Sequence, residues 1–325
     1  MEGLIGCSEV MVELHETVRR VASSQATVLI CGPSGTGKEM VARAIHALSP
    51  MAERALVTVD CTSIPANLME SELFGHERGA FTDAKSQKLG LLETAEGSTV
   101  FLDEIGLMPL ELQAKLLHVL ETHRFRRLGG NAEVGLNIRV LAATNEDLET
   151  AVKEGRFRED LYYRLNVLPI DLPALSDRGD DVILIADHYL REFAGLHGTG
   201  VRQLTDNTRA LLRGYYWPGN VRELRNVIER AVLMTDGEFV RAEDLAIDRR
   251  SRRIAKPTPD GLMIQIGEEV FLTFPYQDLG LDQIERAVIE GVLRDTGGNV
   301  TKAATLLKVS RDTLRYRIGK HKIVV

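Results

Sequence analysis

The sequence of 325 residues is poor in cysteine and aromatic residues and contains no long apolar run. Its three cysteines lack the paired spacing of zinc ligands and are too few for a disulfide framework, which indicates a reducing compartment. Every window of 18 residues contains a charged residue, which excludes a membrane-spanning helix. The N-terminus has no basic segment followed by an apolar core, so no secretory signal is expected. These absences predict a cytoplasmic protein without membrane contact.

The sequence also lacks an overall excess of positive charge. Acidic residues outnumber basic ones by 47 to 40, and the net charge of −7 excludes a uniformly basic nucleic-acid coat. The balance is reversed in the last 45 residues, where nine basic residues accompany five acidic ones. A basic tail on an acidic body predicts that the C-terminal part contacts an anionic partner.

The length of 325 residues predicts two or three domains, at roughly 150 residues per domain. Before residue 170, four short β-branched runs alternate with amphipathic segments, which predicts a parallel sheet with helical connections. The four runs are residues 27–31, 55–59, 98–102 and 138–142. From 180 to 245 the pattern is helical only and includes a helix from Val221 to Leu233 that begins at a capping Asn220.

Residues 249–280 resemble a linker in composition, because they open with an arginine-rich run and then contain prolines and a glycine. Alternating apolar residues between 262 and 272 predict a small hairpin, and the sequence leaves its role open.

The last 45 residues predict three short helices. A helix over 300–307, a turn at Lys308 and Val309, and a helix over 311–319 capped by Ser310 are typical of a helix-turn-helix motif. The last helix of such a motif enters the DNA major groove. The predicted DNA-binding residues are Ser310, Arg311, Thr313, Arg315 and Arg317. A three-helix dimerisation or packing module remains the alternative.

A glycine-rich segment follows the first predicted strand and opens a helix, which is the setting of a phosphate-binding loop. It consists of Gly32, Pro33, Ser34, Gly35, Thr36, Gly37 and Lys38. Backbone N–H groups of such a loop point at phosphates, and the lysine neutralises the β- and γ-phosphate oxygens. Residue 39 is Glu instead of the Ser or Thr that usually binds magnesium, so Mg²⁺ has to rely more on water and on another carboxylate. A plain glycine-rich turn does not account for Lys38.

Polar residues at two further strand ends complete the predicted site. Asp103 and Glu104 end a buried strand, where Asp103 is expected to bind Mg²⁺ and Glu104 to polarise the attacking water. Asn145 follows another strand and is expected to position water or sense the γ-phosphate, although Asn at such a place is commonly a turn residue.

Three arginines further along the chain are candidates for contacts with phosphate. Arg158 and Arg164 are expected to stabilise transition-state charge in a neighbouring subunit, and Arg222 to reach the phosphates from the helical part. From spacing alone, a pair of surface salt bridges is the favoured explanation for Arg158 and Arg164, and an exposed helix charge is the alternative for Arg222.

Residues 70–84, ESELFGHERGAFTDA, resemble the ESELFGHExGAFTGA segment of the AAA+ activators of sigma-54 RNA polymerase, the bacterial enhancer-binding proteins. The resemblance runs from Leu4 to about Ala246 and again from Leu281 to Ile323. It implies an α/β fold, with a parallel-sheet P-loop ATPase core over 1–172 and an all-α lid over 173–247. A linker over 248–280 and a Fis-type helix-turn-helix domain over 281–325 are expected to follow.

The same resemblance assigns roles to individual residues. It implies that Asp103 and Glu104 are the magnesium and water-activating acids, Asn145 and Arg222 the first and second sensors, and Arg158 and Arg164 arginine fingers that act in trans. Glu39, which the family also carries, is a possible further magnesium ligand beside Asp103. Ile5 and Gly6 are expected to line the adenine pocket. The loop that contacts sigma-54 falls on Gly79, Ala80, Phe81, Thr82, Asp83 and Ala84, with a supporting loop near 127–130.

Two residues depart from the family pattern. Asp83 replaces the usual Gly, which adds a charge and restricts φ at the loop tip. Asp60 stands where many members carry Asn, and its charge would repel Glu104 if the two groups were ionised and close.

The resemblance implies an ATP-hydrolysing, Mg²⁺-dependent activator that binds enhancer double-stranded DNA. It is expected to form a homo-oligomeric ring, a hexamer in most of the family, with dimers when inactive. Hydrolysis would drive the loop against sigma-54 RNA polymerase and open the promoter. Because the chain begins close to the ATPase core, no N-terminal regulatory domain is expected. One alternative is a DNA-binding regulator that uses ATP only as an assembly switch, and another is an AAA+ unfoldase or replication loader.

Overall fold

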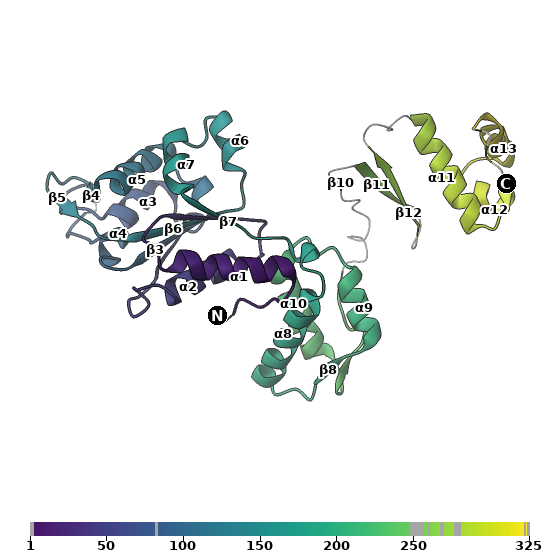
Figure 1. Cartoon of the computed structure of the whole chain (residues 1–325), viewed down its shortest axis with the longest axis horizontal. Helices are drawn as coiled ribbons and strands as arrows, with labels where there is room; N and C mark the ends of the chain where they lie inside the picture. The colour runs from purple at the N-terminus through teal and green to yellow at the C-terminus, as the bar shows by residue number, and fades with distance from the viewer. Residues whose placement is uncertain are drawn as a thin grey trace. The chain divides into compact units, whose positions relative to one another are not determined.

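The computed structural model describes residues 3–81, 84–247, 257–258, 261–266, 270–275, 281–321 and 323. The chain forms two compact units, Met1–Ile247 and Asp248–Val325, which can be followed by colour in Figure 1. Among the described residues, none of the helices combines the length and the apolar character needed to cross a bilayer.

A five-stranded parallel sheet forms the centre of the first unit, with the strand order β2-β3-β6-β1-β7. The strands are β1 (Val28–Cys31), β2 (Val57–Asp60), β3 (Thr99–Asp103), β6 (Arg139–Thr144) and β7 (Leu168–Asp171). The parallel sheet predicted from four apolar runs is confirmed. The sequence reading missed β7, an edge strand with only two apolar residues beside Pro169.

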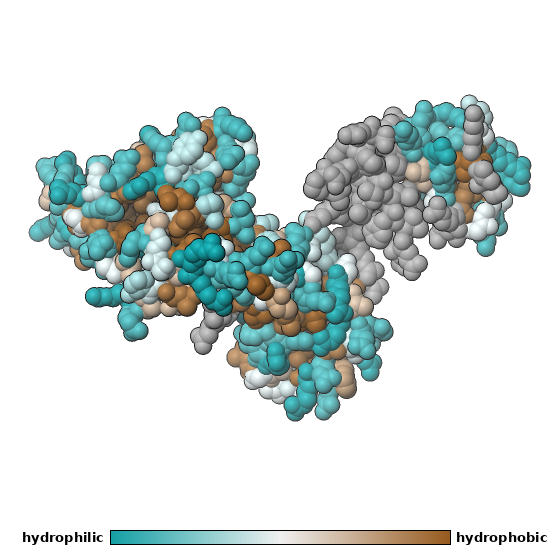
Figure 2. Space-filling view, in the orientation of Figure 1, coloured by the Kyte–Doolittle hydropathy of each residue, from teal (hydrophilic) through white to brown (hydrophobic). Residues whose placement is uncertain are grey.

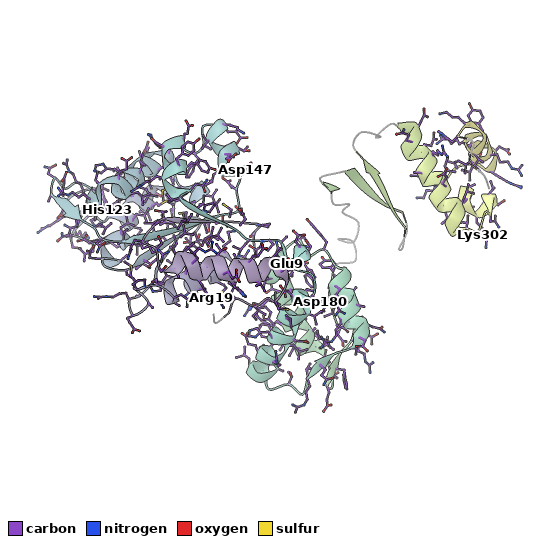
Figure 3. All side chains as sticks on the ribbon, viewed as in Figure 1. Glu9, Arg19, His123, Asp147, Asp180 and Lys302 are labelled. Atoms are coloured by element: carbon purple, nitrogen blue, oxygen red, sulfur yellow. The ribbon has the colours of Figure 1, made fainter. Side chains whose placement is uncertain are left out.

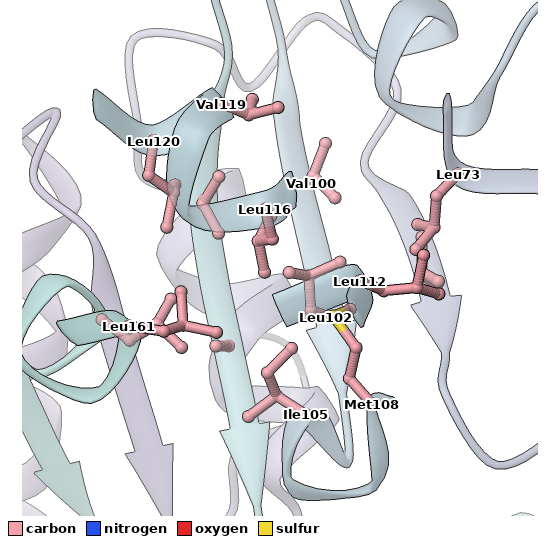
Figure 4. Close-up of a cluster of buried hydrophobic side chains, with 14 of the residues drawn as sticks. Leu73, Val100, Leu102, Ile105, Met108, Leu112, Leu116, Val119, Leu120 and Leu161 are labelled. Carbon is pink, nitrogen blue, oxygen red and sulfur yellow. The ribbon is translucent and has the colours of Figure 1, made fainter. Parts of the chain in front are cut away.

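Helices cover both faces of this sheet (Figure 1). Val28 and Ile30 of β1 pack with α1 (Glu9–Ala22) and α2 (Lys38–Ala47), while Leu29 packs on the opposite face. That opposite face is covered by α3 (Ala66–Phe74), α5 (Leu110–Thr122) and α7 (Glu159–Leu165), and Figure 4 shows its closely packed side chains. Because strand side chains alternate between faces, a strand buried on both faces reads as a continuous apolar run.

Short elements connect these layers. They are α4 (Leu91–Thr94), the 3₁₀ helix η1 (Ile105–Leu107), the antiparallel pair β4 (Arg124–Arg126) and β5 (Glu133–Gly135), α6 (Leu148–Lys153) and the 3₁₀ helix η2 (Leu175–Asp177). The η1 helix begins directly after the predicted catalytic acids, and the β4–β5 pair encloses the predicted supporting loop.

A helical lid follows the sheet within the first unit. It contains α8 (Asp181–His197), α9 (Asp206–Gly214) and α10 (Asn220–Met234), with a short parallel pair formed by β8 (Gln203–Leu204) and β9 (Phe239–Val240). The predicted capping role of Asn220 is wrong, because Gly219 occupies the N-cap position and Asn220 has a positive φ of 51°. The Asn220 amide is used in contacts outside its own helix.

The second unit contains a small sheet and three helices. The strands β10 (Pro257–Thr258), β11 (Gly261–Ile266) and β12 (Val270–Pro275) are antiparallel, which confirms the predicted hairpin. The helices are α11 (Leu281–Asp295), α12 (Val300–Leu306) and α13 (Arg311–Lys320). Leu314 and the Ala303–Ala304 pair are buried between them. Hydrophilic residues cover much of the described surface of both units that is visible in Figure 2. Asn299 and Ser310 cap α12 and α13 through their side chains, as predicted for Ser310.

Candidate functional site

The phosphate loop joins β1 to α2 and depends on glycine at two positions. Gly35 and Gly37 have φ values of 78° and 105°, which residues other than glycine rarely adopt. A Cβ atom on Gly35 would lie 2.4 Å from the Gly219 carbonyl oxygen, so the close approach of the lid also requires glycine there. Lys38 is buried at the start of α2, and its Nζ donates to the Gly32 carbonyl at 3.1 Å.

Glu104 is held beside this lysine. Its Oε1 lies 3.3 Å from Lys38 Nζ, and its Oε2 accepts a hydrogen bond from the Asn145 backbone N–H at 3.0 Å. The structure therefore brings together Lys38, Glu104 and Asn145 from three separate segments. Asn145 makes this contact through its backbone, which a reading of side-chain types could not show.

Asp103 occupies the end of β3 next to Glu104. Burial raises the pKa of Asp103, the charge of Glu104 raises it further, and Lys38 opposes the shift. The parallel register sets Asp60 opposite Asp103, and the Asp60 charge adds to the same rise in pKa. Asp60 itself accepts hydrogen bonds from Thr62 N–H at 2.8 Å and Thr62 Oγ1 at 2.6 Å, and these bonds lower its own pKa.

Glu39 is engaged on the surface of α2. Its Oε1 accepts hydrogen bonds from Arg43 Nε at 2.9 Å and Nη2 at 2.6 Å, and both side chains are about half exposed. Glu39, the possible further magnesium ligand, thus has Arg43 as its partner in the structure.

The lid contacts the phosphate loop directly. Arg222 Nη1 donates to Ser34 Oγ at 2.9 Å, and Asn220 Nδ2 donates to the Ser34 carbonyl at 2.9 Å. The backbone N–H groups of Val221 and Arg222 both approach the Gly35 carbonyl, at 2.9 and 3.3 Å. The structure thus places Arg222 at the phosphate loop, as the sequence predicted.

Two buried charged residues at this junction escaped the sequence reading. Arg178 Nη2 donates to the Thr36 carbonyl at 2.8 Å and to the Pro173 carbonyl at 2.9 Å, and burial lowers its pKa. Asp181 accepts hydrogen bonds from the backbone N–H groups of Cys7 and Ser8. Both lie in the charged segment 177–181, whose composition is typical of a solvent-exposed helix start. They are buried because distant segments of the chain pack against them.

Asp181 also positions the segment predicted to line the adenine pocket. A Cβ atom on Gly6 would lie 2.8 Å from Asp181 Oδ2, and Ile5 packs against the lid core. Figure 3 shows the start of α1 at Glu9 beside the start of α8 at Asp180. The structure therefore sets Ile5 and Gly6 between the sheet and the lid.

The two predicted arginine fingers contact different partners. Arg158 precedes α7, and its Nε and Nη2 donate to the Asp160 carboxylate at 3.0 and 2.7 Å. Arg164 lies at the other end of α7 and donates from Nη2 to the Leu120 carbonyl at 2.6 Å. Both side chains are exposed.

The described residues of the predicted sigma-54 loop lie close to His76 and to the supporting loop. Phe81 is 41% exposed, and its ring lies edge-on to the His76 ring with the centroids 5.0 Å apart. Gly79 N–H donates to the Ala84 carbonyl at 2.8 Å, and Ala80 lies against Gly129 of the supporting loop. Thr82 and Asp83 lie outside the described residues.

The predicted DNA-binding residues of α13 divide into two groups. Arg311, Thr313 and Arg315 are exposed, and Ser310 caps the helix by accepting from Thr313 N–H. Arg317 is also exposed, but it forms an ion pair with Glu285 of α11, so its charge already has a partner within the unit. Tyr316, which the sequence reading passed over, is 74% exposed.

Comparison with known families agrees with this geometry. Residues 4–171 match the sigma-54 interaction domain, residues 176–260 match the AAA+ ATPase lid domain, and residues 280–321 match bacterial regulatory proteins of the Fis family. The first match alone covers just over half of the 325 residues. The chain belongs to the sigma-54 activator family. Its fold is a parallel-sheet AAA+ core with a helical lid and a C-terminal Fis-type helix-turn-helix, as the resemblance implied.

Individual relatives are similar along almost the whole chain. Nitrogen fixation protein AnfA of Azotobacter vinelandii is 42% identical over 98% of this chain and 57% of its own length. Regulatory protein AtoC of Escherichia coli (strain K12) is 43% identical over 97% of this chain and 67% of its own. The structure of NtrX from Brucella abortus in complex with ATP superposes with a TM-score of 0.72 at 33% identity, over 98% of this chain and 69% of NtrX. The chain therefore spans 57% to 67% of the length of these two curated relatives.

Proposed function

We propose that this chain is a Mg²⁺-dependent ATPase that activates transcription by remodelling sigma-54 RNA polymerase. The observation that carries the proposal is the cluster of Lys38, Asp103 and Glu104 at a phosphate loop, in a chain whose first 171 residues include the sigma-54 interaction domain. The NtrX relative described in complex with ATP supports the choice of nucleotide.

The chemistry of the site fits magnesium. Asp103 offers carboxylate oxygens, which are the ligands that Mg²⁺ prefers, and its raised pKa reflects a buried negative charge that a cation would stabilise. Bound Mg²⁺ would neutralise charge on the phosphate oxygens. We propose Asp103 as the magnesium ligand. Glu39 could contribute only if its ion pair with Arg43 were broken.

The ion pair between Lys38 and Glu104 suggests how nucleotide binding prepares the site. A γ-phosphate and the Glu104 carboxylate are both anions, so an incoming phosphate competes with Glu104 for Lys38. Glu104 remains bonded to Asn145 N–H, which keeps its carboxylate near the site. Glu104 is then available to orient and deprotonate the attacking water, with Asn145 as the first sensor.

The remaining site residues fit the same reaction. Arg222 contacts the phosphate loop and acts as the second sensor, and Ile5 and Gly6 line the adenine pocket. Arg158 and Arg164 lie exposed on either end of α7, from which they serve a neighbouring subunit. This arrangement requires a homo-oligomeric ring, which we propose to be a hexamer that assembles from inactive dimers.

Two surfaces connect hydrolysis with transcription. Gly79 to Ala84 form the loop that contacts sigma-54, and the helix-turn-helix binds enhancer DNA through Arg311, Thr313 and Arg315 on the exposed side of α13. We propose that the ATPase subdomain with the sigma-54 loop spans 1–172 and that the lid spans 173–247. A linker over 248–280 then joins them to the DNA-binding domain over 281–325. Such partners are found in the bacterial cytoplasm, and we propose that location.

Open-complex formation by sigma-54 RNA polymerase tests the proposal. The native chain is expected to open a dependent promoter with ATP, while Phe81→Ala hydrolyses ATP at the native rate and opens none, because the exposed ring of Phe81 is the apolar contact of the loop. Phe239→Ala is a matched control, since Phe239 is also about half exposed but lies in the lid.

Asp83 favours one second candidate, a DNA-binding regulator that uses ATP only as an assembly switch. Under that function the native chain would hydrolyse ATP without opening the promoter, and Asp83→Gly would restore opening. Opening by the native chain excludes it.

A further inference from the structure

Gln113 of α5 is a polar side chain enclosed in the apolar layer beneath the sheet. It is 0% exposed, and Figure 4 shows the apolar side chains of this layer, among which Met108 and Leu112 lie against each other. A buried amide is costly unless its polar atoms are hydrogen-bonded. Gln113 therefore has to be explained by the groups that it binds.

The amide of Gln113 binds two different segments of backbone. Its Nε2 donates to the Met108 carbonyl at 2.7 Å and to the Arg156 carbonyl at 3.1 Å. Its Oε1 accepts a hydrogen bond from the Arg158 backbone N–H at 2.8 Å. The two N–H groups of one nitrogen thus fix the spacing between the Met108 and Arg156 segments.

The first of these segments continues directly from the catalytic acids. Met108 follows η1, whose N-cap residue is Glu104 with the positive φ of 51°. The Leu107 N–H donates to the Glu104 carbonyl and the Met108 N–H to the Ile105 carbonyl, so this turn is internally bonded. The backbone from Glu104 to Met108 is therefore a continuous hydrogen-bonded turn.

The second segment carries the proposed arginine finger. Arg156 and Arg158 lead into α7, and the Tyr162 N–H donates to the Arg158 carbonyl in the first turn of that helix. The Arg158 side chain is exposed while its backbone is tied to a buried amide. Gln113 is thus the shared anchor of an internal catalytic segment and an exposed arginine.

We infer that Gln113 is a positioning residue that links the acid segment of a subunit to the arginine finger that the same subunit offers to its neighbour. The inference rests on the proposed function, in which Arg158 acts in trans. Loss of the amide frees the Arg156–Arg158 segment, so Arg158 is presented in the wrong place while the nucleotide contacts of the subunit remain.

The first measurement is steady-state ATP hydrolysis by Gln113→Met, which keeps a side chain of similar length without the amide. Misplacing a reacting group by about 1 Å costs on the order of 10²-fold in rate, so kcat is expected to fall by about 10- to 100-fold with little change in the KM for ATP. Gln113→Leu repeats the test with a branched side chain that also lacks the amide. Gln203→Met is the control, because Gln203 is exposed in the lid. A native kcat in both Gln113 variants overturns the inference.

Mixed rings then identify which part of the site is damaged. The reference mixture combines Glu104→Gln, which keeps its finger, with Arg158→Ala, which keeps its acids, and it is expected to regain hydrolysis that neither variant has alone. Gln113→Met is expected to regain activity when mixed with Glu104→Gln but not when mixed with Arg158→Ala, because it lacks only a well-placed finger.

The other outcomes distinguish a failure of the inference about Gln113 from a failure of the proposed trans action of Arg158. Recovery with Arg158→Ala, or with neither partner while the reference mixture recovers, overturns the positioning role of Gln113 alone. Failure of the reference mixture, with both of its members folded and able to bind ATP, overturns the trans action of Arg158 and the inference with it.

Discussion

The nucleotide site and the recognition helix α13 use charged residues in opposite ways. Around the phosphate loop, Lys38 and Arg178 are buried, and each is bonded to backbone or to an opposite charge. On α13, Arg311 and Arg315 extend into solvent from a helix with a single buried residue, Leu314. The first arrangement fixes the position of charges before a ligand arrives, and the second leaves side chains to adjust to a partner.

This difference follows from the work that each region is proposed to do. Catalysis requires groups that are already in place, because reorganising them at the moment of reaction raises the barrier. Binding to the DNA backbone depends mainly on charge near phosphates, which long exposed side chains supply without fixed geometry. The contrast predicts that a small change at the nucleotide site lowers the rate of hydrolysis strongly. A substitution on α13 is expected to lower the affinity for DNA only moderately.

The largest effect is expected for Glu104→Gln. This change keeps the shape of the side chain but removes the carboxylate that accepts a proton, and general-base catalysis contributes about 10²–10⁴-fold to rates. We expect kcat for ATP hydrolysis to fall by that factor, while ATP binding and DNA binding stay at native levels. Glu121→Gln, on the exposed surface near the end of α5, is the matched control. Hydrolysis within twofold of native would contradict the role of Glu104.

A moderate effect is expected at the recognition helix. Arg315→Ala should weaken binding to enhancer DNA by about 1–3 kcal/mol, measured by titration of labelled duplex at a fixed salt concentration. Arg317→Ala should weaken it less, because Arg317 is paired with Glu285, and should lower the free energy of unfolding of the second unit by less than about 1 kcal/mol. Equal losses of DNA affinity in the two variants would show that the ion pair opens on DNA.

The smallest effect is expected for Asp60→Asn and concerns pH. Asp103 has to be ionised to hold Mg²⁺, so hydrolysis declines as pH falls through its pKa, which lies above the ordinary range because of burial and the charge of Glu104. The negative charge of Asp60 adds to that rise. Its removal lowers the pKa of Asp103, and the acid limb of the pH–rate profile should move to lower pH. An unchanged or higher acid limb would contradict the coupling.

Sequence reasoning found the parts of the chain whose chemistry demands particular residue types. The phosphate loop, Asp103 and Glu104 follow buried strands, and strands buried on both faces are visible as apolar runs to within about two residues of their ends. Arg222 is predicted only through the resemblance to the family, because an exposed helix charge explains it as well from its position in the sequence. The strand β7 was missed, since its alternation is broken by Pro169 at the edge of the sheet.

The supporting contacts could not be predicted from sequence. Gln113, Arg178 and Asp181 are polar residues on helices or at a helix start, where exposure is the usual expectation. Their burial depends on segments up to 174 residues away, as in the hydrogen bond between Cys7 N–H and Asp181. Asn220 illustrates the same point, because a good capping residue before a helix is used instead to bind Ser34 from across the molecule.

The hydrogen bonds between lid and phosphate loop also bear on how the protein folds during synthesis. Ser34 is bonded to Asn220 and Arg222, which are 186 and 188 residues later in the chain. A ribosome adds about 5–20 residues each second, so these partners emerge roughly 10–40 s after the loop itself. During that interval the loop carbonyls face water, and the nascent chain should acquire its full affinity for nucleotide only after the start of α10 has left the exit tunnel.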